Sequence, residues 1–222
     1  MIAVEDLGHC EFGDAIDCMN RRVASLVSGE SPERILVLEP RPVITLGRDT
    51  RSSSLVVPLE EIRAKGIPTV EVGRGGDVTW HGPGQLVFFP LVRLGRRRLD
   101  VYSFIELMVR CVAETLAAFG IEADPPGDEI GVWVRQKKIA SIGIRHEDGI
   151  ASHGIALNVC PDFEWLDYIN PCGDPGRNVT SFELLLGDCP TIEHVKAIFL
   201  ARLRSGLEVS PPRRTGVSHA RV

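Results

Sequence analysis

Short apolar runs, each ended by proline, glycine or charged residues, constrain the fold of this chain more than any other feature of its sequence. Runs of this length between turn-forming residues are typical of β-strands. They lie at residues 35–38, 43–46, 67–72, 131–134, 138–144 and 153–159, with the turn-forming Glu147-Asp148-Gly149 between the last two. Hairpin-like pairs outnumber strict alternation of strand and helix. The sequence therefore predicts an α+β fold with a mixed or antiparallel sheet packed with helices.

Helices are expected between and after these runs, over about 59–65, 101–119, 180–187 and 191–204. The clearest begins after Asp100, a good N-cap, and places apolar residues at spacings of three and four. Cys111 lies inside this helix, and we expect it in the core. Thr180 and Glu183 have the spacing of a capping box at the start of a short helix that ends near Gly187.

Length and composition predict one soluble domain. A chain of 222 residues can bury a substantial core, and we expect a single domain over 1–206 with a flexible tail over 207–222. No apolar run approaches the ~20 residues that span a bilayer, and the amino terminus lacks the features of a secretory signal. A cytoplasmic location without membrane partners is therefore expected, and the net charge of −5 argues against nucleic-acid binding.

The six cysteines stand at 10, 18, 111, 160, 172 and 189, without a C-x-x-C pair or the spacing of a zinc site. In a reducing cytoplasm most of them should be free thiols. The sequence predicts neither a metal nor another cofactor.

The segment from Arg74 to Gln85 concentrates glycines, an arginine, a histidine and an amide between two expected strands. Glycines let backbone N–H groups approach a ligand closely, and such groups can stabilise an oxyanion. An ordinary turn with His81 as a satisfied core histidine is the plainer alternative. The segment matches neither G-x-x-x-x-G-K-[ST] nor G-x-G-x-x-G, so an ATP-dependent step has no visible site.

This segment, R-G-G-x-x-T-aromatic-H-G-P-G-Q, resembles the signature of the lipoyl(octanoyl) transferase family, the octanoyl-carrier-protein:protein octanoyltransferases of lipoate biosynthesis. Further stretches agree in order and spacing: Leu46-Gly47-Arg48, Lys138–Arg145, His153–Val159, Pro171-Cys172-Gly173 and Val179-Thr180-Ser181. The resemblance covers roughly residues 34–187. Two departures are Phe89, where the family commonly has tyrosine, and Asp174-Pro175 after the cysteine.

The resemblance implies a fold shared with biotin- and lipoate-protein ligases. It also implies that a thiolate accepts octanoate from acyl carrier protein. A lysine of a lipoyl domain of 2-oxo acid dehydrogenase complexes, or of the glycine-cleavage H protein, would then attack the acyl-enzyme. A thioester is already activated, so this exchange needs no nucleotide, in agreement with the missing phosphate loop.

Cys172, between Pro171 and Gly173 in a polar loop, is the expected nucleophile, and Lys138 is expected to promote its ionisation. If 138–144 is a regular strand, Lys138 shares the more apolar face with Ala140, Ile142 and Ile144, while Lys137 lies on the other face. The acyl pocket is expected to be lined by Arg74, Gly75, Gly76, Asp77, Val78, Thr79, Trp80, His81, Ser141, Ile142, Gly143, Gly154, Ile155 and Ala156.

Two other functions remain open at this level. An ATP-dependent lipoate- or biotin-protein ligase would share the fold, and a non-catalytic acyl-binding protein would keep the fold without turnover. A further hypothesis concerns Arg93, Arg96, Arg97 and Arg98, which could dock the acidic carrier protein or could simply form a solvated turn.

Overall fold

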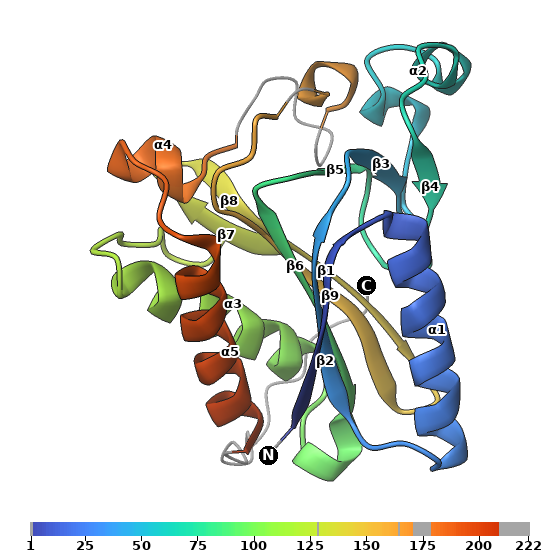
Figure 1. Cartoon of the computed structure of the whole chain (residues 1–222), viewed down its shortest axis with the longest axis vertical. Coiled ribbons are helices and arrows are strands. Elements are labelled where there is room, and N and C mark those ends of the chain that lie inside the picture. The colour runs from blue at the N-terminus through green and yellow to red at the C-terminus, as the bar shows by residue number, and fades with distance from the viewer. Residues whose placement is uncertain (1, 128, 164, 171–178, 209–222) are drawn as a thin grey trace.

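A six-stranded mixed sheet forms the centre of the computed structural model, which describes residues 2–127, 129–163, 165–170 and 179–208. In spatial order its strands are β1 (Ala3–Cys10), β2 (Arg34–Pro40), β6 (Gln85–Arg93), β9 (Ile150–Asn158), β8 (Lys137–Glu147) and β7 (Gly131–Val134). Only β1 and β2 pair in parallel; the other neighbours are antiparallel. The predicted α+β class with a mixed sheet is confirmed (Figure 1).

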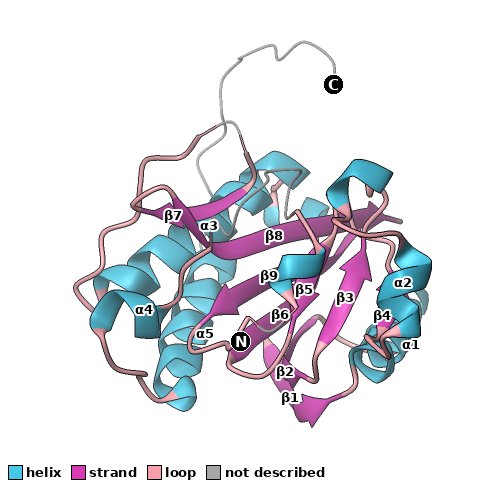
Figure 2. Cartoon of the chain, turned by 90° about the horizontal axis from the view of Figure 1, so that it is seen from above, coloured by secondary structure: helices cyan, strands magenta, loops and turns pink. Residues whose placement is uncertain are grey.

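A smaller sheet lies at one end of the central sheet, as Figure 2 shows. It contains β4 (Thr69–Glu71), β3 (Val43–Leu46) and β5 (Thr79–His81), and α2 (Leu59–Ala64) follows β3 in the chain. The two apolar runs at 35–38 and 43–46 are both strands, but they belong to different sheets. The proline-containing connection between them therefore leads from the central sheet into the smaller one.

Helices cover both faces of the central sheet (Figure 1). On one face lies α1 (Phe12–Ser28), and on the other lie α3 (Val101–Ala117) and α5 (Ile192–Glu208), with the short α4 (Phe182–Leu186) before α5. Phe104 and Phe199 pack with Phe88 of the sheet in the core under α3 and α5, called here the α3/α5 core. Met19 packs with Phe89 in the core under α1, called here the α1 core. None of the described helices is long and apolar enough to cross a membrane.

Helix ends differ in detail from the sequence expectation. Asp100 caps α3 as predicted, since its side chain accepts a hydrogen bond from the Ser103 N–H at 2.7 Å. The cap of α4 is Ser181, whose hydroxyl accepts from the Leu184 N–H at 3.2 Å, so the prediction of a cap at Thr180 is wrong by one residue. Backbone pairing explains the shift, because the Thr180 N–H already donates to the Lys138 carbonyl. Helix α5 continues to residue 208, two residues past the expected domain boundary.

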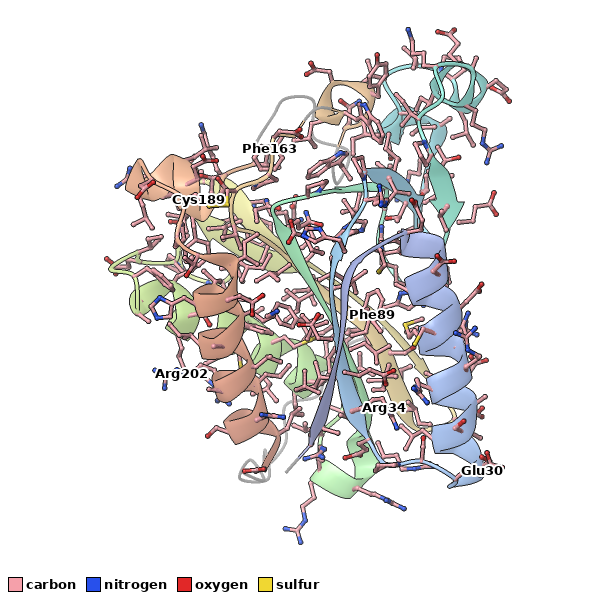
Figure 3. All side chains as sticks on the ribbon, viewed as in Figure 1. Glu30, Arg34, Phe89, Phe163, Cys189 and Arg202 are labelled. Carbon is pink, nitrogen blue, oxygen red and sulfur yellow. A yellow bond between two sulfur atoms is a disulfide. The ribbon has the colours of Figure 1, made fainter. Side chains whose placement is uncertain are left out.

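One disulfide joins Cys160, just after β9, to Cys189, just after α4 (Figure 3). This pair is the exception to the expectation that most of the cysteines are free thiols. Cys10, Cys18 and Cys111 are free. Burial raises the pKa of the Cys111 thiol to about 12, which confirms the prediction that it is a core residue of α3.

The turn between β7 and β8 depends on one carboxylate. Arg135 and Gln136 both have positive φ, 52° and 63°, which is costly for residues with a side chain. Asp124 accepts hydrogen bonds from both of their N–H groups, at 2.9 and 2.7 Å. Its own N–H donates to the Trp133 carbonyl at 2.8 Å. Asp124 thus fixes the end of the hairpin that carries Lys138.

Replacing this carboxylate should destabilise the protein. We expect Asp124→Ala to lower the free energy of unfolding by ~1–3 kcal/mol, because two hydrogen bonds to a charged acceptor are lost. Urea denaturation measures the change. The matched control is Glu122→Ala, on the same connection and exposed, with an expected change within about 0.5 kcal/mol. Equal effects of the two substitutions would contradict this role of Asp124.

Candidate active site

Arg74 organises the glycine-rich loop from inside. Its guanidinium donates to the hydroxyls of Thr45 and Thr79, both at 2.9 Å, and to the carbonyl of Asp77 at 2.8 Å. The hydroxyls belong to β3 and β5, so one side chain joins the loop to two strands of the smaller sheet. Replacing Arg74 would therefore disturb the shape of the loop as well as any contact with a ligand.

The backbone N–H groups of Gly75 and Gly76, two of the four glycines of this segment, are already used within the protein. Gly75 donates to the Ile144 carbonyl at 3.1 Å, and Gly76 donates to the Asp49 carboxylate at 2.6 Å. A Cβ at Gly47 would lie 2.2 Å from the Gly76 carbonyl oxygen, so only glycine allows this approach. The expected oxyanion role is therefore not available to the N–H groups of Gly75 and Gly76 in this arrangement.

Side chains of the loop and of β5 point either into the core of the smaller sheet or toward α1. Val78 and Trp80 are buried in the core of the smaller sheet, and the Asp77 carboxylate accepts from the Ser54 hydroxyl. These three residues fix the loop to the smaller sheet. His81 lies on the other side, where its ring stacks on Phe12 at the start of α1, with 4.7 Å between ring centres.

A chain of hydrogen bonds fixes the tautomer of His81. The Thr180 carbonyl can only accept, so the amide of Asn158 must donate to it, at 3.0 Å. The Asn158 oxygen then accepts from the Gln85 amide at 2.9 Å, and the Gln85 oxygen accepts from Nδ1–H of His81 at 2.6 Å. Nε2 therefore carries a lone pair. This atom is buried and has no hydrogen-bond partner among the described residues.

His153 is a second buried histidine, which the sequence reasoning did not include in the site. It stands at φ 57° directly before Gly154, and its ring packs edge-on against Phe89, 5.9 Å away. Phe89 in turn packs edge-on against Phe12, between the sheet and α1 (Figure 3). Phe89 thus links Phe12, which stacks on His81, to His153. The signal that could have identified His153 is its place in His153–Val159, one of the stretches that resemble the family.

The residues of β8 and β9 that were expected to line the acyl pocket lie on both faces of the sheet. Gly143 lies directly beneath the loop, because a Cβ there would lie 2.9 Å from Cδ of Arg74 and 3.0 Å from the Gly75 carbonyl oxygen. We call this side of β8 and β9 the loop face. Ile142 and Ile155 belong to the α3/α5 core instead, so they can offer only backbone atoms to a ligand on the loop face.

The other three expected residues have different surroundings. Ser141 is two residues from Gly143 and shares its face, and Ala156, opposite Ser141, packs in the α1 core. A Cβ at Gly154 would lie 2.2 Å from the Phe88 carbonyl oxygen on β6. Enlarging Gly154 would therefore disturb the sheet and cannot test acyl-chain length.

Lys138 lies at an irregular point of β8. In the pairing with β7, Val132 faces Ala140, but the next residue, Trp133, faces Lys138. Ile139 is therefore an extra residue of a β-bulge on β8.

The bulge reverses the face of the lysine. Regular alternation predicts Lys138 on the face of Ile142, which packs in the α3/α5 core together with Val132. Trp133 alternates with Val132, so Trp133 and the lysine opposite it lie on the loop face. The predicted alternation is wrong here, yet Lys138 is buried, at 7% exposure, and Lys137 is exposed, as expected.

Cys172 lies outside the described residues, as do the neighbouring Pro171 and Gly173 and the Asp174-Pro175 departure. The described chain resumes at Val179, which forms a β-bridge with Lys138.

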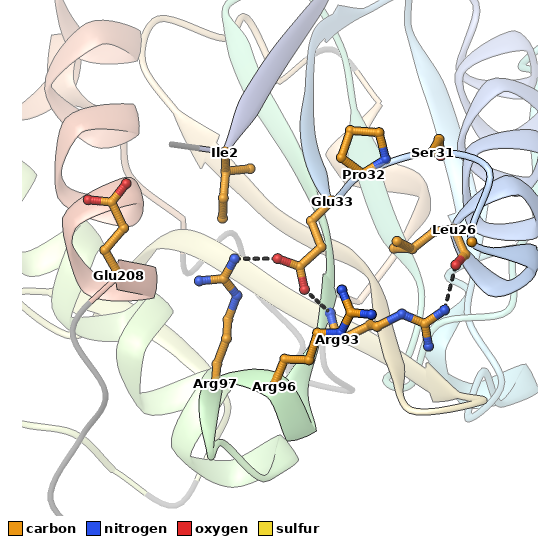
Figure 4. A pocket seen from close by; sticks show the side chains of 10 residues that line it. Ile2, Leu26, Ser31, Pro32, Glu33, Arg93, Arg96, Arg97 and Glu208 are labelled. Atoms are coloured by element: carbon orange, nitrogen blue, oxygen red, sulfur yellow. Dashed lines mark hydrogen bonds and ion pairs between the residues drawn. The ribbon is translucent and has the colours of Figure 1, made fainter.

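Two of the four clustered arginines are used within the fold. Arg93 donates to the carbonyl of Leu26 at the end of α1, and Arg97 forms an ion pair with Glu33 (Figure 4). They line a surface cavity of about 320 Å³. These partners fix the turn after β6 to the connection between α1 and β2.

Arg96 and Arg98 are exposed. Arg93, where the cluster begins, is the last residue of β6. Gln85, the hydrogen-bond partner of His81, is the first residue of the same strand. At ~3.4 Å per residue these ends are ~27 Å apart. The four arginines therefore do not form one free cationic surface beside the loop.

Comparison with known proteins finds sequence relatives over most of the chain. The sequence pattern of the lipoyl protein ligase A/B catalytic domain matches residues 13–204. An octanoyltransferase of Chloroflexus aggregans is 35% identical over 213 residues, which cover 95% of this chain and 96% of the relative. An octanoyltransferase of Geobacter metallireducens is 38% identical over 184 residues, with 83% of each protein covered.

Solved structures share the fold. Lipoate-protein ligase A bound with ATP has a TM-score of 0.68 at 15% identity, covering 97% of this chain and 89% of that one. Biotin protein ligase from Aquifex aeolicus, in complex with biotin and ATP, has a TM-score of 0.62 at 14% identity, covering 94% and 71%. The expected ligase-like fold is confirmed. The chain belongs to the lipoyl protein ligase A/B catalytic-domain family. Its similarity to octanoyltransferases within that family identifies it as an acyltransferase.

The two buried histidines should make the fold sensitive to acid. Burial, with a smaller contribution from Arg74, lowers the pKa of His81 and of His153 from 6.5 to about 3. The unfolded chain binds protons below about pH 6.5 that the folded chain excludes. Stability is therefore full above that pH and falls toward pH 3, by up to ~1.4 kcal/mol per pH unit for each histidine.

Urea denaturation between pH 7 and pH 5 measures this slope. His153→Asn, which tolerates positive φ, should make the slope shallower, while replacement of the exposed His146 by Gln should leave it as in the unmodified protein. A slope that is unchanged in His153→Asn would contradict the assignment.

Proposed function

We infer that the chain transfers an octanoyl group from the thioester of acyl carrier protein, through a thioester on Cys172, to a lysine of a protein acceptor in lipoate biosynthesis. The acceptors are lipoyl domains of 2-oxo acid dehydrogenase complexes and the glycine-cleavage H protein. The octanoyltransferase relatives support the acyl group and the reaction class. In the first half-reaction the thiolate attacks the carrier thioester and the carrier thiol leaves; in the second an amine displaces the cysteine sulfur.

The position of Lys138 is the observation that carries this proposal. A buried lysine on the loop face, joined by a β-bridge to Val179, is an unusual feature in a sheet and has a chemical use. Its amine can take the proton from the thiol and return it to the leaving carrier thiol.

His81 contributes a hydrogen-bond acceptor to this proposed site. Its Nε2 lone pair is buried, and the chain through Gln85 and Asn158 holds the ring in one tautomer. A donor of the substrate, such as the incoming amine, can use this lone pair. Because burial keeps the pKa of His81 at about 3, the ring stays neutral and remains an acceptor at physiological pH.

Substitution of the proposed catalytic pair is the direct test. After exposure to octanoyl-carrier protein, Cys172→Ser should show no thioester-linked octanoyl adduct by intact-protein mass spectrometry. Lys138→Ala should slow formation of the adduct by about 10²-fold or more, the scale of a lost general base.

Lys137→Ala is the matched control, because it removes the neighbouring, exposed lysine of the same strand. It should form the adduct at nearly the rate of the unmodified protein. A strong effect of Lys137→Ala with a weak effect of Lys138→Ala would reverse the assignment, and an adduct on Cys172→Ser at the normal rate would exclude the nucleophile.

Donor chemistry separates the proposed reaction from that of the ATP-dependent ligases with the same fold. Incubated with a lipoyl domain, the protein should octanoylate the acceptor when the donor is octanoyl-carrier protein and should not do so from free octanoate with ATP and Mg²⁺. Acceptor acylation from free octanoate and ATP alone would favour a ligase.

A further inference from the structure

We propose that Trp133 is a positioning residue, which holds the side chain of Lys138 in the orientation that activates the thiol. This inference rests on the catalytic role proposed for Lys138. It concerns a residue that has no reacting atom of its own and acts through the lysine.

The geometry joins the two side chains directly. Nζ of Lys138 lies 4.7 Å from the centre of the Trp133 ring, within the range of a cation–π interaction. The negative face of an indole ring attracts a positive charge more strongly than that of the other aromatic side chains. The charge arises when the amine takes the thiol proton, and because Lys138 is buried, water competes little for it. A free lysine side chain populates many rotamers, and ordering it costs conformational entropy. The ring therefore restricts the side chain of Lys138 to fewer orientations.

The bulge on β8 creates this pair. Without the extra residue, Ile139 would face Trp133 and Lys138 would face Val134. With it, the lysine and the indole become cross-strand neighbours on the loop face, the arrangement in which side chains interact most strongly. One local irregularity thus sets both the face of Lys138 and the ring that it meets.

Gly131 provides the space for the lysine stem. A Cβ at this position would lie 2.6 Å from Cε of Lys138, 2.9 Å from the Ala140 carbonyl oxygen and 3.0 Å from the Trp133 ring. Real Cβ atoms do not approach other atoms so closely, so any side chain here would displace the lysine or the ring. Gly131 and Trp133 therefore lie on the same face of β7, and both contact the space that the Lys138 side chain occupies.

The backbone that carries the ring is held in place by the fold. Val132 and Val134, on either side of Trp133, are buried in the α3/α5 core. The Trp133 carbonyl accepts from the Asp124 N–H at 2.8 Å. These contacts fix the backbone of Trp133 on both sides, and with it the point from which the indole extends over the lysine.

The experiment compares Trp133→Leu with Trp133→Phe in the full chain. We expect Trp133→Leu to slow octanoyl-adduct formation about tenfold, the scale of a lost cation–π contact, and Trp133→Phe to retain most of the rate. Trp133→Leu should also move the midpoint of the pH profile for iodoacetamide alkylation of Cys172, which a merely structural role would not change. Tyr102→Leu, on the exposed side of α3, is the control and should change neither quantity.

A double substitution, together with the single ones, separates the possible failures. In the Lys138→Ala background, Trp133→Leu should have no additional effect on adduct formation. If Lys138→Ala impairs the reaction but Trp133→Leu alters neither rate nor pH profile, the positioning role is wrong while the proposed function stands. If Lys138→Ala itself has no effect, the proposed role of the lysine fails first.

Gly131→Ala keeps the proposal testable if Trp133→Leu does not fold. It keeps the tryptophan itself and should slow adduct formation, because its Cβ would displace the lysine stem or the ring. A normal rate in a folded Gly131→Ala protein would overturn the inference.

Discussion

The antiparallel pairing of β6 with β9 is the constraint on which the other parts of the structure depend. These two strands lie in the middle of the central sheet, and every residue of both except Arg93 is buried. Their side chains supply both the α1 core and the α3/α5 core. Because Gln85 faces Asn158 in this register, the same pairing connects His81 to Thr180 and so to the strand of Lys138. A slip by one residue would exchange the two cores and break that connection.

The bulge on β8 shows how a small departure from regular pairing changes the face of the sheet on which a side chain lies. One extra residue moves Lys138 from the core face to the loop face, while the neighbouring strand keeps its valines in the core. The same strand therefore places Ile142 in the α3/α5 core and a buried lysine on the loop face. A buried amine needs such a defined environment, because its desolvation is otherwise unfavourable.

Apolar runs and turn residues were sufficient to predict most of the strands and α3, because the signals for these elements are local. They were not sufficient for β1, β5 and α1. No residue of β1 is fully buried, and its exposed and half-buried positions do not alternate regularly. Helix α1 is amphipathic, with Phe12, Ala15, Met19 and Leu26 buried, but it is rich in charged residues and starts without a side-chain cap. The disulfide between Cys160 and Cys189 was also beyond the sequence, because it joins positions 29 residues apart that only folding brings together.

The sequence by itself determined the family, the residue types of the candidate site and the class of the fold. Motif spacing carries that information, because the chemistry needs particular groups in a particular order along the chain. The tertiary structure decided how those groups are used: the N–H groups of Gly75 and Gly76 are taken up by Ile144 and Asp49, and Ile142 and Ile155 face away from the loop. It also decided the face of Lys138. Each of these outcomes depends on which distant strand or loop lies opposite, and a periodic pattern read along one segment contains no information about its partner.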